Sequence, residues 1–146
     1  MANEPIYLVK TTNQIQWGSR QYYYNCSREG GNYNWFANNI EEAKNLAAEF
    51  STKSEKANST FQTWLAHSLK GSIALAENDY KKAISEFEKS NLQNPQTFYN
   101  LALAFSGEGN KLEAKKYAEK CASFNALINI NQSFVRNKAK EFLKTI

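Results

Sequence analysis

The sequence is poor in the residues that metal sites and tight turns require. It contains a single histidine, His67, two cysteines, six glycines and two prolines in 146 residues. So few turn-forming residues argue against a many-stranded β-sandwich. A metal site would have to rest largely on carboxylates, because histidine and cysteine ligands are scarce. We therefore predict no metal site and no cofactor.

The chain also lacks a long apolar run and a recognisable export signal. No stretch approaches the ~18–20 apolar residues that a membrane span needs. Residues 1–10 do not show a basic segment followed by an apolar one, so we predict no signal peptide and expect a cytoplasmic protein. With 42% hydrophobic and 22% charged residues, the chain is expected to fold, as a single domain over 1–146.

Sequence motifs of the common catalytic classes are missing. There is no GxSxG, HExxH, P-loop or dinucleotide-binding pattern. His67 follows Trp64 and Leu65 in a helical pattern, and no nucleophile accompanies it, so we expect a structural or exposed histidine. The sequence therefore predicts no catalytic residues and no enzymatic activity.

Helical periodicity begins in the middle of the chain. One stripe at steps of three and four residues is formed by Phe61, Trp64, Leu65, Leu69, Ile73 and Ala76. Asn78-Asp79 interrupts it, and a second stripe follows with Tyr80, Ala83, Ile84 and Phe87. The second helix must end before Pro95, because the residue before a proline avoids the α region. We predict a helix pair over 61–94.

The same arrangement recurs in the next stretch of sequence. A stripe of Phe98, Leu101, Ala102 and Phe105 is broken by the sequence Gly-Glu-Gly-Asn at 107–110, and apolar residues resume from Leu112 to Ala122. This predicts a second pair over 96–124. Gly71 and Ala102 are 31 residues apart, as are Ala83 and Ala114. Small residues at these positions would let two helices cross closely, beside the larger Phe87 and Tyr117.

These two segments resemble the tetratricopeptide repeat family. The sequence LKGSIALAENDYKKAISEFEKSNLQNP at 69–95 has the family's glycine, its Asp-Tyr and alanine, the aromatic four residues later, and the final proline. The segment at 98–121 matches again, but has Ala118 where the aromatic is expected. The resemblance implies an all-α fold: a right-handed superhelical stack of antiparallel helix pairs that binds proteins.

The two ends of the chain fit this pattern less closely. We interpret residues 14–56 as a divergent first helix pair, whereas residues 1–12 are either a short strand or a helical lead-in. An apolar face within residues 132–146 predicts a final helix that caps the stack. The alternative for this basic, amphipathic helix is a membrane surface.

The resemblance also implies a concave face that is lined by the first helix of each pair. The matching positions here are Leu65, Ser68, Ser72, Leu75, Tyr99, Asn100, Leu103 and Ser106. Asn100 matches an asparagine with which some members hold a peptide backbone or a terminal carboxylate. Ser68 and Ser72 replace the lysine and asparagine of that carboxylate clamp, so binding of chaperone tails is not supported. The partner implied is an extended peptide or a helix.

The net charge of +4 arises entirely after residue 106. Residues 107–146 contain four acidic and eight basic side chains, namely Lys111, Lys115, Lys116, Lys120, Arg136, Lys138, Lys140 and Lys144. This region is either a solvated outer face or a patch that attracts an acidic partner. No aromatic–basic RNA motif accompanies it, so nucleic acid is not the partner that we expect.

Two further features leave alternatives open. The aromatic cluster formed by Tyr22, Tyr23, Tyr24, Tyr33, Trp35 and Phe36 fits core packing, but it would also suit a surface for a partner, a sugar ring or self-association into a homo-oligomer. Cys26 and Cys121 show neither CxxC nor metal-ligand spacing, so we interpret them as buried thiols and not as a redox pair.

Overall fold

The computed structural model describes residues 7–10, 15–18, 34–37, 40–125 and 130–146. Three short strands come first along the chain: β1 (Tyr7–Lys10), β2 (Ile15–Gly18) and β3 (Asn34–Ala37). The described helices are α1 (Ile40–Ala57), α2 (Thr60–Ala76), α3 (Tyr80–Glu88), α4 (Pro95–Glu108), α5 (Lys111–Ala122) and α6 (Ile130–Leu143).

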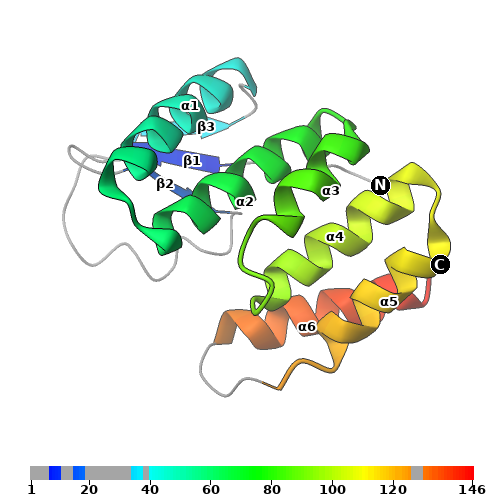
Figure 1. The fold of residues 1–146 in the computed structure, drawn as a ribbon. Helices are drawn as coiled ribbons and strands as arrows, with labels where there is room; N and C mark the ends of the chain where they lie inside the picture. Colours follow the sequence, from blue (N-terminus) through cyan, green and yellow to red (C-terminus); the bar gives the residue numbers. More distant parts are fainter. Residues whose placement is uncertain (1–6, 11–14, 19–33, 38–39, 126–129) are drawn as a thin grey trace.

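From α1 onward, the described part of the chain is a row of packed helices, as the sequence predicted. Each helix packs against the next one along the chain, and α4 also contacts α6. Figure 1 shows the row running from α1 at one end of the molecule to α5 and α6 at the other. The pairs α2–α3 and α4–α5 correspond to the two pairs that the repeated pattern predicted.

The N-terminal region departs from the helical prediction. The prediction of a first helix within residues 14–56 is wrong where the structure describes it, because Ile15–Gly18 forms β2. The second helix of that predicted pair begins only at Ile40, because Asn34–Ala37 forms β3. Both strands pair antiparallel with β1. The strand order is β2-β1-β3, and Leu8 lies opposite both Trp17 and Phe36. Short apolar runs fit either periodicity, and β-branched and aromatic residues favour strands once partners are available. Of the two alternatives for residues 1–12, a short strand or a helical lead-in, the structure shows a strand at Tyr7–Lys10.

Side chains at the turns fix where the helices begin and end. Four helices begin after a residue whose side chain accepts a hydrogen bond from a backbone N–H of the first turn: Ser59, Asp79, Asn94 and Asn110. Pro95 occupies the first turn of α4, where its missing N–H costs nothing. Gly109 ends α4 at a φ of 91°, a left-handed conformation that glycine adopts without steric penalty.

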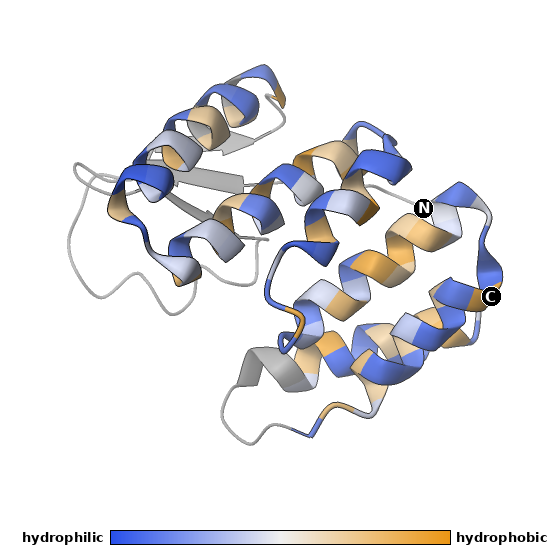
Figure 2. Ribbon diagram, viewed as in Figure 1, coloured by the Kyte–Doolittle hydropathy of each residue, from blue (hydrophilic) through white to orange (hydrophobic). Residues whose placement is uncertain are grey.

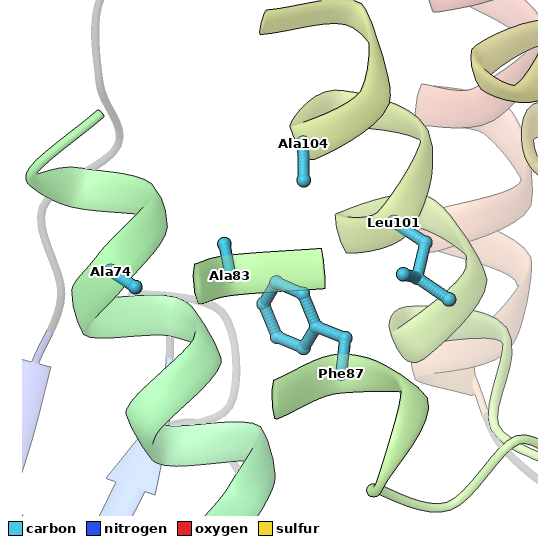
Figure 3. Close-up of a cluster of buried hydrophobic side chains, with 5 residues drawn as sticks. All are labelled: Ala74, Ala83, Phe87, Leu101 and Ala104. Atoms are coloured by element: carbon cyan, nitrogen blue, oxygen red, sulfur yellow. The ribbon is translucent and has the colours of Figure 1, made fainter. Parts of the chain in front are cut away.

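The core of the first pair is built around one aromatic ring. Phe87 is fully buried among Ala74, Ala83, Leu101 and Ala104, and Figure 3 shows its ring lying between α2 and α4. A Cβ added to Gly71 would stand 2.7 Å from this ring, closer than atoms pack. The small residues predicted at the helix crossings are indeed buried, namely Gly71, Ala83, Ala102 and Ala114.

In the second pair, α6 supplies the bulk that the repeat itself lacks. Ala118 stands at the position where an aromatic was expected, and it is fully buried in a cluster with Ala102, Ala114 and Phe142. Phe142 belongs to α6, so this last helix covers the small residues of the pair before it. Tyr117 lies at the flank, half-buried, and stacks on Phe105 with ring centroids 5.5 Å apart.

The interface between α5 and α6 encloses Cys121. Its side chain is buried with Val135 and Ala139. Burial raises the pKa of the thiol to about 12, although the nearby Arg136 charge acts in the opposite direction. The prediction of a buried thiol is confirmed for Cys121, whereas Cys26 lies outside the described residues, as do Tyr22, Tyr23, Tyr24 and Tyr33 of the aromatic cluster.

Candidate functional site

The predicted concave face is represented on α2 by a single stripe of side chains. Leu65, Ser68, Ser72 and Leu75 follow one another at helical spacing and therefore share one side of the helix. Ser68 is buried, and the other three are half-buried. The Ser72 Oγ donates a hydrogen bond to the Ser68 carbonyl at 2.9 Å, so this hydroxyl is satisfied within the helix. The stripe offers mainly apolar contact.

Two aromatic residues extend this stripe at the N-terminal end of α2. Phe61 is 62% exposed and Trp64 is 38% exposed. The apolar spacing of the sequence predicts both as part of the helix stripe, and neither is among the predicted site residues. Their spacing from Leu65 and Ser68 is the signal that could have found them, because steps of three and four residues place all four on one face.

The predicted residues on α4 divide into two groups. Tyr99 and Leu103 pack toward α6: the Tyr99 ring meets Phe142 edge-on with centroids 6.3 Å apart, and Leu103 contacts the same cluster. Asn100 is buried, and its Oδ1 accepts a hydrogen bond from Gln96 Nε2 at 3.0 Å. This contact directs the amide NH2 of Asn100 away from Gln96. Ser106 is half-buried near the end of the helix.

His67 connects the two helices of the first pair. Its Nδ1 lies 2.8 Å from Glu86 Oε2, and Lys89 Nζ lies 3.6 Å from the other carboxylate oxygen. Burial raises the pKa of Glu86, but the hydrogen bond and charge of His67 and the charges of Lys89 and Lys70 outweigh burial, leaving this pKa below its usual value. Among the described residues, no three His, Cys, Asp or Glu side chains could hold a metal ion together.

Most of the predicted basic patch is engaged in contacts within the chain. Lys116 and Lys144 each lie 2.8 Å from a glutamate, and Arg136 Nε donates to the Ala122 carbonyl at 3.3 Å. Lys120 and Lys138 lie over aromatic rings at 5.0 and 4.9 Å from the centroids. Of the eight residues in this predicted patch, all of which the structure describes, Lys111, Lys115 and Lys140 have no such partner. Figure 2 shows α5 as largely hydrophilic and α4 as largely hydrophobic.

Comparison with known proteins assigns the central segment to a family. Residues 66–97 and 95–126 each match the family model described as tetratricopeptide repeat. No curated protein and no solved structure matches the chain. No helix in the described part of the chain has the length and apolar character to cross a bilayer. Repeats of this family generally mediate protein–protein interactions. The two matched segments, 66–97 and 95–126, coincide with the helix pairs α2–α3 and α4–α5, so the central part of the chain resembles two tandem tetratricopeptide repeats.

Proposed function

We propose that this chain is a non-enzymatic interaction module that binds an extended peptide or a helix of a partner protein. The binding face is formed by the first helix of each pair, α2 and α4. The observation that carries the proposal is the stripe on α2, the first helix of the first repeat, where Leu65, Ser72 and Leu75 stay partly open to solvent. Such a face supplies apolar contacts along an extended ligand.

Asn100 adds a polar contact to this face. Gln96 already donates to its Oδ1, and the amide NH2 group of Asn100 carries two N–H donors. A backbone carbonyl of the ligand is the matching acceptor. Tyr99 and Leu103 support this face indirectly, since their contacts with the Phe142 cluster fix α6 beside α4.

The proposal is tested by selecting ligands from a random 12-residue peptide display library and measuring their affinity by fluorescence polarisation. Ser72→Lys places a long charged side chain in the middle of the stripe, at a half-buried position. We expect binding to weaken by at least about tenfold, because the lysine blocks the apolar face and must be desolvated. Ser85→Lys, the same change on the exposed side of α3, is the matched control. Equal affinities for the two variants would contradict the proposal.

A further inference from the structure

The exposed apolar residues are not evenly distributed over the described part of the chain. Four large hydrophobic side chains are exposed there: Phe61, Trp64, Leu92 and Leu112. Leu92 and Leu112 belong to different segments, and single exposed leucines are common on protein surfaces. Phe61 and Trp64 are one helical turn apart on α2, and the half-buried Leu65 adjoins them. Together these three side chains make one continuous apolar surface.

This surface continues the binding face that we propose above. Phe61, Trp64, Ser68, Ser72 and Leu75 are spaced so that they share one side of α2. At a rise of about 1.5 Å per residue, the stripe is about 21 Å long, and Ser68 and Ser72 lie about 6 and about 12 Å along the helix axis from Trp64. A ligand lying along the stripe therefore meets bulky aromatic rings at one end and small side chains in the middle.

No charged side chain belongs to this stripe. The cationic residue of α2, Lys70, lies half a helical turn away from it, and α2 contains no aspartate or glutamate. His67 also points elsewhere, toward Glu86 on α3. A charged ligand group placed over Trp64 or Ser72 would lose water and would find no counter-ion on α2. The stripe therefore suits an uncharged segment.

We propose that Phe61 and Trp64 form an anchor subsite for one bulky aliphatic or aromatic side chain of an uncharged partner segment. A tryptophan in such a contact contributes a large share of the binding free energy, since its indole buries a wide area with little loss of side-chain freedom. This inference rests on the proposed function and specifies which ligands the face accepts.

The test uses the peptides that the random 12-residue library yields on the wild-type protein. We expect these peptides to share one bulky apolar residue without charged neighbours. Their affinity should fall by at least about tenfold in Trp64→Ala and in Phe61→Ala. Leu112→Ala is the matched control, because Leu112 is 78% exposed on α5, away from the stripe, and it should leave the affinity unchanged. Raising the salt concentration tenfold should change the affinity by less than about threefold, since no ion pairs form.

Three results would overturn the inference. If Ser72→Lys abolishes binding while Trp64→Ala and Phe61→Ala do not weaken it, the face binds peptides without this anchor and the proposed function stands alone. The anchor subsite would also be excluded if the selected peptides are charged and bind with steep salt dependence. It would likewise be excluded if light scattering shows a concentration-dependent dimer that Trp64→Ala abolishes. If the library yields no ligand, both proposals fail. Circular dichroism melting of each variant checks the fold, and Phe61→Ala, at the more exposed position, serves if Trp64→Ala does not fold.

Discussion

Gly71 and Phe87 set how closely the two helices of the first repeat approach. The ring of Phe87 fills the space that any side chain at residue 71 would need, and it has no room to withdraw because Ala83 and Leu101 enclose it. The pair therefore couples one residue of α2 to one residue of α3. The effect of changing either residue should depend on the other.

Gly71→Ala should destabilise the chain by about 1–3 kcal/mol, because its Cβ would meet the buried Phe87 ring at 2.7 Å. Urea unfolding followed by circular dichroism measures the change. In the double variant Gly71→Ala/Phe87→Leu, the cost of the alanine should be smaller than in the wild-type background. A cost that stays the same in both backgrounds would contradict the proposed contact.

Glu86 should make stability depend on pH in the acidic range. Its pKa in the folded chain lies below the ordinary value of 4.5, so its ionised form stabilises the fold at neutral pH. That contribution is lost as the pH falls through the folded-state pKa. Glu86→Gln should therefore cost about 0.5–1.5 kcal/mol near neutral pH. The difference from the wild type should vanish in acid, as measured by urea unfolding across pH. Glu88→Gln, at an exposed position on the same helix, should show a smaller difference near neutral pH.

At the scale of helices, α6 completes the second repeat. Phe142 fills the volume beside Ala118, and its contact with Tyr99 ties α6 to α4 as well as to α5. A stack of helix pairs needs such a cover, since its last pair would otherwise expose an apolar face. Here Phe142 of α6 also fills the space of the aromatic residue that the second repeat lacks at Ala118.

Phe142→Ala should cost about 3–5 kcal/mol, because it removes a nearly fully buried ring and leaves a cavity lined by alanines that cannot fill it. Thermal or urea unfolding measures the loss. Lys140→Ala, on the exposed side of α6, should stay within about 0.5 kcal/mol of the wild type. Similar losses in the two variants would mean that α6 does not pack as described.

The helices from α2 onward could be predicted because apolar spacing, capping residues and the 31-residue repeat all agree. The N-terminal region could not be, because its apolar runs are short. Trp35 and Phe36 fit the start of a long helix as well as a strand, and the pairing of β3 with β1 decides between them. Such pairing joins segments distant in sequence, which a local pattern does not reveal.

The candidate site was predictable in part for a similar reason. The resemblance to tetratricopeptide repeats implied Leu65, Ser68, Ser72 and Leu75 as part of one face, and their helical spacing on α2 agrees with it. Spacing does not reveal which part of α2 the neighbouring helices leave uncovered. The sequence pattern therefore does not distinguish the exposed Phe61 and Trp64 from buried apolar residues of the same helix. Nor does spacing reveal that Tyr99 and Leu103 pack against the cluster that contains Phe142 of α6.

At the scale of the whole molecule, stability should vary along the row of helices. α4 lies in its interior and contacts α3, α5, α6 and α2, and Leu101, Ala102 and Ala104 are fully buried. The outermost helices have fewer neighbours, and repeat arrays open from their ends. Backbone amides of α4 should therefore exchange with deuterium most slowly among the described helices, and those of α1 most rapidly. Uniform exchange in hydrogen–deuterium mass spectrometry would indicate a single all-or-none unit instead.

The rate at which the buried Cys121 thiol is alkylated measures how often the C-terminal helix opens. A thiol whose pKa is about 12 holds almost no thiolate at neutral pH, and its burial denies an alkylating reagent any access. Alkylation of Cys121 therefore requires that α6 separates from α5. The rate at which peptides containing residue 121 gain the label then reports how often the array opens at its tail.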